Sequence, residues 1–169
     1  AQLLIIVGAN PLGGIDRALL QSLVDLAGGN VLRHTADALD HLMRSAEAGY
    51  VVIGSDIGGY LDIDDENLTG PKIPFSEVNF ARWTAVGAMT PFMQLHGRGN
   101  FAPWTVPTMA TELTALYRYW AKLHTQLIPF WYSLAEKAYA GGPTLIRPLG
   151  AVADQWKKYE YQLGEAFLV

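Results

Sequence analysis

Residues 51–60, VVIGSDIGGY, decide the fold, because an apolar strand runs directly into a carboxylate and two glycines. Residues 51–53 are apolar without polar alternation, which is typical of a parallel strand that is covered on both faces. Asp56 follows where this strand would end, and Gly58 and Gly59 leave room for another group to approach the backbone. The stretch therefore predicts an α/β fold with Asp56 at the carboxyl edge of a sheet.

Strand and helix patterns alternate on both sides of this stretch. Residues 3–7 and 91–96 (PFMQLH) are further apolar strand candidates, and residues 144–149 and 166–169 also have strand character. Helices are expected over residues 15–26, 35–48, 79–89 and 110–139. Gly28 and Gly29 should end the first helix, Thr35 and Gly49 should begin and end the second, and Asn79 should cap the third. Pro129 should kink or split the last helix. This order predicts a parallel sheet with helical cover. Three such strands do not close a barrel of eight, so we expect an open sheet or part of a larger body.

Composition excludes several classes of function. The net charge is −4 and no long basic run occurs, so nucleic-acid binding is not expected. The chain has no cysteine, which rules out disulfides, thiol catalysis and cysteine-ligated metal. No apolar run is long enough for a membrane span, and the first residues lack the charged start of a signal peptide. We therefore expect a soluble chain, with the cytoplasm as its default compartment.

Six segments in a fixed order carry a resemblance to a known family. They are GYVVIGSDIGGY (49–60), RWTAVGAMTPFMQLHGRG (82–99), APW (102–104), LIPFWYSLAEKAYAGG (127–142), LIRPLG (145–150) and YQLGEAFLV (161–169). Together they make about residues 35–169 resemble the family 31 glycoside hydrolases: α-glucosidases, α-xylosidases and sulfoquinovosidases. The resemblance implies a partial (β/α)8 TIM barrel, its C-terminal part, over residues 31–142 and the start of a C-terminal β-sandwich over 143–169. Residues 1–30 form an unmatched βα segment.

The resemblance also implies a sugar site. Tyr50–Asp56 would be barrel strand seven and Pro91–His96 strand eight, so Asp56 and His96 should point into one barrel mouth. A carboxylate accepts hydrogen bonds from sugar hydroxyls, and an imidazole donates one. The implied substrate-binding residues are Asp56, Tyr60, which could stack on a sugar face, and His96, with Arg98 and Trp104 in the following loop.

The implied activity is retaining hydrolysis of α-glycosidic bonds through a covalent glycosyl-aspartate. The family's nucleophile lies on strand four, and no matching segment occurs here. Gly28-Gly29-Asn30 stands near the implied acid/base position and has no acid. Asp25 lies close by in spacing and is an acid/base candidate, although the family's Trp and Gly do not precede it. Gln94 stands where the family often has arginine. We therefore expect a carbohydrate partner, no cofactor or metal, and an isolated chain that is inactive. Open strand edges should associate with the missing barrel segments or with other chains.

Alternative interpretations remain open. The chain could be a non-catalytic, truncated or designed barrel subdomain. Gly8 to Gly14 resembles the turn of a nucleotide-binding α/β protein, although its spacing is not G-x-G-x-x-G. Residues 62–67, DIDDEN, suggest a calcium loop, but Asn67 replaces the required glycine, so a solvated acidic loop is the simpler interpretation. Asp56 and His96 could each serve structure alone.

Overall fold

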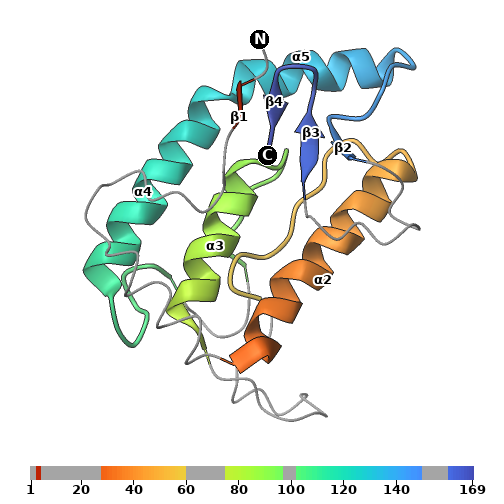
Figure 1. Ribbon diagram of the computed structural model, residues 1–169. Helices are drawn as coiled ribbons and strands as arrows, with labels where there is room; N and C mark the ends of the chain where they lie inside the picture. The colour runs from red at the N-terminus through yellow and green to blue at the C-terminus, as the bar shows by residue number, and fades with distance from the viewer. Residues whose placement is uncertain (1–2, 5–27, 60–74, 97–101, 150–159) are drawn as a thin grey trace.

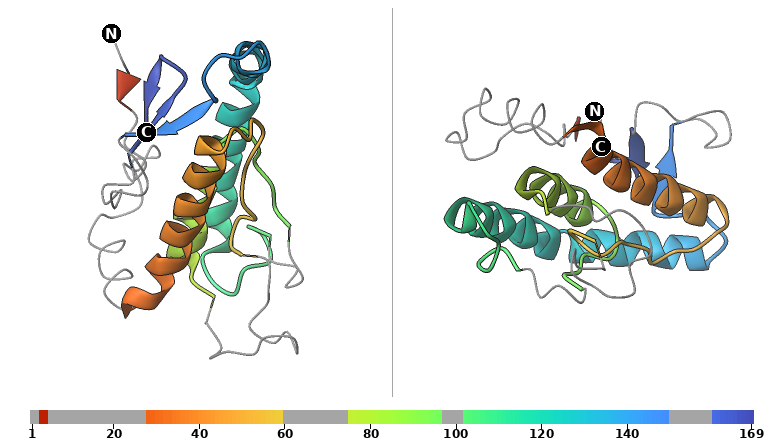
Figure 2. Two further views of the ribbon diagram at one scale, coloured as in Figure 1. Left: turned by 90° about the vertical axis from the view of Figure 1, so that its right-hand side faces the viewer. Right: turned by 90° about the horizontal axis from the view of Figure 1, so that it is seen from below.

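The computed structural model describes residues 3–4, 28–59, 75–96, 102–149 and 160–169. Its elements are β1 (Leu3–Leu4), α2 (Gly28–Glu47), α3 (Glu77–Ala88), α4 (Ala110–Gln126), α5 (Ile128–Tyr139), β2 (Ile146–Pro148), β3 (Tyr161–Leu163) and β4 (Phe167–Leu168). Helix α3 packs against both α2 and α4, and the strands lie near the ends of α2 and α4 and beside α5 (Figure 1). Seen from below, α4 and α5 form one row, and both α2 and the strands lie on the same side of that row (Figure 2).

The sheet differs from the prediction in its pairing. Its order is β1-β4-β3-β2, and its pairs are antiparallel except for β1 with β4. Leu3 pairs with Phe167 and not with residues 50–54, because a short apolar strand fits any open sheet edge and its sequence does not choose the partner. Residues 50–54 and 91–96 form no regular strands and share one isolated bridge. The four described strands therefore form a mainly antiparallel sheet, and the parallel direction expected of the segments around residues 50–54 and 91–96 is seen in that bridge.

Helix α2 begins earlier than its expected cap. It starts at Gly28, so Thr35 lies within it and Gly28 and Gly29 belong to it. Its apolar stripe faces the core: Leu39, Leu42, Met43 and Ala46 are all buried. Packing of this stripe on α3 and β2 outweighs the low helix propensity of glycine and the capping preference of threonine.

Gly49 ends α2, as the sequence predicted. Its φ is +91°, and its N–H donates to the Ala46 carbonyl at 3.0 Å, a geometry that glycine adopts without strain. A Cβ at this position would meet nothing within 4 Å, so backbone strain is the whole cost of adding one.

We expect Gly49→Ala to lower the free energy of unfolding by about 1–2 kcal/mol, because an L-residue is strained in the left-handed region. Urea denaturation checks the value. Gly49→Asn is the matched control and should lose less, since asparagine tolerates positive φ. Equal losses for the two variants would mean that backbone strain is not the cause.

Helix α3 is capped by Ser76 and not by Asn79. The Ser76 side chain accepts a hydrogen bond from the Asn79 backbone N–H at 3.2 Å, so Asn79 lies in the first turn. Serine and asparagine cap equally well, and the sequence alone did not separate them. Phe80, Trp83 and Val86 of this helix are buried.

Pro129 splits the long helical region as predicted. Helix α4 ends at Gln126, and Pro129 stands in the first turn of α5, where its missing N–H costs nothing. Around the break, Trp120 and Trp131 are buried, whereas Tyr119 and Tyr132 are 39% and 66% exposed. None of the helices in the described part of the chain has the length and apolar character to cross a bilayer.

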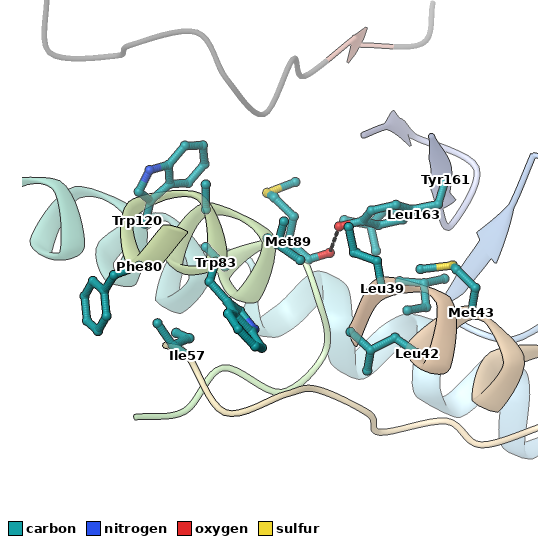
Figure 3. Close-up of a cluster of buried hydrophobic side chains, with 14 of the residues drawn as sticks. Leu39, Leu42, Met43, Ile57, Phe80, Trp83, Met89, Trp120, Tyr161 and Leu163 are labelled. Carbon is teal, nitrogen blue, oxygen red and sulfur yellow. Dashed lines mark hydrogen bonds between the residues drawn. The ribbon is translucent and has the colours of Figure 1, made fainter. Parts of the chain in front are cut away.

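One core joins the helices to the strands. Phe80, Met43 and Met89 from the helical part and Tyr161 and Leu163 from β3 are all fully buried in it (Figure 3). The Tyr161 hydroxyl donates to the Met89 carbonyl at 3.0 Å, directly after α3. Burial raises the pKa of Tyr161 above its usual value. The residues that follow α3 are therefore tied to the sheet.

Tyr161→Phe should remove this hydrogen bond and lower the free energy of unfolding by about 1 kcal/mol at neutral pH. Because the folded pKa is raised, the unfolded state loses the Tyr161 proton first, and the associated stability is lost as pH rises above about 10. The variant should therefore lose stability less steeply than the parent at alkaline pH. Urea midpoints from pH 7 to 11 test this, and parallel curves would refute it.

Candidate functional site

Two extended segments, residues 51–57 and 91–96, meet at the candidate site. The Phe92 N–H donates to the Ile53 carbonyl at 3.2 Å, and the Ile57 N–H donates to the Gln94 carbonyl at 3.1 Å. Asp56 and Gln94 form a parallel bridge. The segments therefore run side by side in the same direction, so their carboxyl ends lie together, as the sequence predicted.

Helix α3 connects and supports these segments. The Trp83 indole N–H donates to the Ser55 hydroxyl at 2.6 Å, which fixes the residue directly before Asp56. On the other side, a Cβ at Gly87 would lie 3.0 Å from Ile57 Cδ1, so the helix approaches the residue after Asp56 closely. Asp56 is thus held on both sides by the packing of α3.

Gly54 lets the two segments approach each other. A Cβ at this position would lie 1.9 Å from the Phe92 carbonyl oxygen, so no larger residue fits without moving the backbone. The glycine of the GSD motif is therefore required for the pairing that aligns Asp56 with Gln94.

Asp56 and His96 lie together at the end of the pair. His96 Nδ1 is 3.6 Å from Asp56 Oδ1, and their side chains are 62% and 22% exposed. The Gln94 side-chain amide donates to the same Oδ1. This contact was not predicted, although Gln94 and His96 are two residues apart and therefore share the face of the segment that carries Asp56.

The two faces of the paired segments differ. Val51, Ile53, Met93 and Leu95 pack against the helical core. The alternate residues Tyr50, Val52 and Phe92 are 66%, 63% and 45% exposed. By alternation they share their face with Asp56, Gln94 and His96. This face is therefore apolar along its length and polar at its carboxyl end.

The remaining predicted site residues are not brought to Asp56 by any described contact. Trp104 is 63% exposed and lines a hollow of about 540 Å³ with Tyr117, Arg118 and Lys122 of α4. Asp25, Tyr60, Arg98, the DIDDEN loop and the Gly8–Gly14 turn lie outside the described residues. Within the described ranges, no group of three or more His, Asp or Glu side chains could hold a metal ion.

His124 has a structural role. Its Nδ1 lies 3.0 Å from the Ala88 carbonyl oxygen at the end of α3, and its ring packs on Trp131 with centroids 5.9 Å apart. These contacts join α4 and α5 to the helix that supports the site.

Comparison with known proteins places the chain in a family. Residues 29–134, more than half of the chain, match the model described as the glycosyl hydrolases family 31 TIM-barrel domain. Neutral alpha-glucosidase C of Macaca fascicularis is 30% identical over 136 residues, which are 76% of this chain and 16% of that protein. Lysosomal alpha-glucosidase of Mus musculus is 28% identical over 116 residues, which are 69% of this chain and 11% of that protein.

A solved structure agrees in fold. The cycloalternan-degrading enzyme from Trueperella pyogenes superposes with a TM-score of 0.55 at 22% identity, over 73% of this chain and 18% of that one. This chain therefore spans less than a fifth of the length of these three proteins. The family match, the ordered sequence segments and the paired carboxyl ends agree: the chain belongs to glycoside hydrolase family 31.

Proposed function

We propose that this chain is part of a retaining α-glycosidase that hydrolyses α-glycosidic bonds in oligosaccharides or glycosides. In this proposal it supplies sugar-binding residues and not the nucleophile. The observation that carries the proposal is the 3.6 Å approach of His96 Nδ1 to Asp56 Oδ1 at the ends of adjacent parallel segments. Barrel enzymes bind their substrates at this end of their strands.

The pair can orient a sugar without breaking a bond. The Asp56 carboxylate accepts hydrogen bonds from hydroxyl groups, and charge-assisted bonds of this kind are short and directional. The His96 ring lies beside it and is 62% exposed. Retaining hydrolysis needs two further carboxylates that flank the scissile bond. We propose that the nucleophile comes from outside this chain, and Asp25 stays an acid candidate.

Three further residues complete the proposed site. Tyr60 follows the two glycines after Asp56 and would stack on a sugar face, and Arg98 follows His96 by two residues. Trp104 would contact a longer ligand from the hollow on α4. These assignments depend on the family's pattern and on position in the sequence.

We also propose that the apolar face of the paired segments is the interior of a barrel that this chain builds in part. Tyr50, Val52 and Phe92 are exposed on it, as side chains would be if they packed against further strands. Exposed apolar patches mark interaction sites. The expected occupants are the remaining barrel strands, supplied by another segment or another chain.

Asp56→Asn should weaken binding of a monosaccharide glycoside at least tenfold, because a hydrogen bond to a charged group contributes about 1.5–3 kcal/mol. Titration of methyl α-D-glucopyranoside and methyl α-D-xylopyranoside, followed by NMR, checks this. The matched control is Asp40→Asn, an exposed carboxylate on α2 that pairs with Arg44 and should leave binding unchanged.

Aryl α-glycosides test the rest of the proposal. We expect the chain alone to bind them without turnover. Unchanged affinity in Asp56→Asn would refute the sugar site, and turnover by the isolated chain would refute the absence of the catalytic pair.

A further inference from the structure

Gln94 has an unusual position for a neutral side chain. It contributes its carbonyl to the pairing of the two segments, and its side-chain amide donates to Asp56 Oδ1. The same oxygen faces His96 Nδ1 at 3.6 Å. Among the described residues, no donor contacts the second carboxylate oxygen, Oδ2. In the described part of the chain, the protein therefore engages one oxygen of Asp56 and not the other.

We propose that Gln94 is a positioning and specificity-determining residue that directs Asp56 Oδ2 toward a neutral sugar. This inference rests on the proposed function of the site. The amide holds Oδ1 as an arginine or lysine would, but it brings no positive charge. The bridge and the amide fix the orientation of the carboxylate.

Charge then decides which sugars fit. Two like charges about 4 Å apart repel each other, and the repulsion is stronger near a protein surface than in bulk water because the effective dielectric constant is lower. Asp56 is 22% exposed, so water screens only part of this repulsion. A carboxylate or sulfonate on the bound sugar would be repelled by Oδ2, and Gln94 offers no charge to offset it. Gln94 therefore favours a neutral pyranoside over an anionic one, relative to a cationic side chain at the same position.

Two variants separate the two roles of Gln94. Gln94→Met keeps the length but lacks the donor, so it should weaken binding of methyl α-D-glucopyranoside about tenfold and shift the Asp56 carboxyl ¹³C signal. Gln94→Arg restores a donor with a positive charge. It should retain binding of the neutral glycoside within about threefold and improve binding of methyl α-D-glucuronide relative to it at least tenfold.

The outcomes that overturn the inference differ from those that overturn the proposed function. Parent-like affinity in Gln94→Met would reject the positioning role, and an unchanged preference in Gln94→Arg would reject the specificity role. If the parent chain binds neither glycoside, the proposed function fails. The ¹³C signal of Asp56 in Gln94→Met then still decides the positioning role, because it needs no ligand. Gln94→Asn, whose amide is one methylene shorter, replaces Gln94→Met if that variant does not fold.

Discussion

Gly54→Ala is expected to separate the two segments of the site and to abolish most of its sugar binding. The added Cβ would lie 1.9 Å from the Phe92 carbonyl oxygen, so the backbone of one segment must move. Overpacking of this kind costs about 1–3 kcal/mol in stability. The movement also breaks the alignment of Asp56 with Gln94, which should lower sugar affinity at least tenfold. Urea denaturation and glycoside titration measure the two effects.

The matched control lies in the same segment. Val52 is 63% exposed, so Val52→Ala changes the size of a side chain in the same segment without creating a clash. It should change stability by less than about 0.5 kcal/mol and leave affinity unchanged. If Gly54→Ala behaves like this control, the close approach of the segments does not support the site.

Phe80→Ala is expected to give the largest loss of stability, about 3–5 kcal/mol, because a fully buried aromatic side chain leaves a cavity. Phe80 also packs beneath the turn after Asp56, since a Cβ at Gly58 would lie 2.9 Å from its ring. The cavity should therefore loosen this turn and weaken sugar binding as well. Chemical denaturation and calorimetry measure the loss.

Two variants control for this effect. Tyr139 is 94% exposed, so Tyr139→Ala removes an aromatic side chain without a cavity and should cost less than about 0.5 kcal/mol. Phe80→Leu keeps much of the volume and should recover part of the loss. A loss below about 1 kcal/mol in Phe80→Ala would show that α3 does not anchor the turn.

The sequence predicted the fold best where one local cause dominates. Pro129 breaks the helix because it lacks an N–H, and Gly49 ends α2 because it adopts positive φ. Boundaries set by tertiary packing were missed, such as the start of α2 at Gly28. The pairing of Leu3 with Phe167 was also missed, because a two-residue strand carries too little pattern to specify its partner.

In the site too, features set by the local sequence could be predicted, and features set by tertiary packing could not. The approach of Asp56 to His96 was predictable, because parallel segments bring their carboxyl ends together. The contact from Gln94 could have been found from the two-residue period of the segment. The bond from Trp83 to Ser55 could not, because it depends on how α3 rotates against the pair. The sequence thus located the carboxylate but not the side chains that hold it.

A structure of this chain with methyl α-D-glucopyranoside bound would test the central claim most directly. The account predicts sugar hydroxyls within about 3.2 Å of Asp56 Oδ2 and of the His96 ring. A sugar bound only in the hollow beside Trp104, with Asp56 and His96 not touching it, would contradict the account.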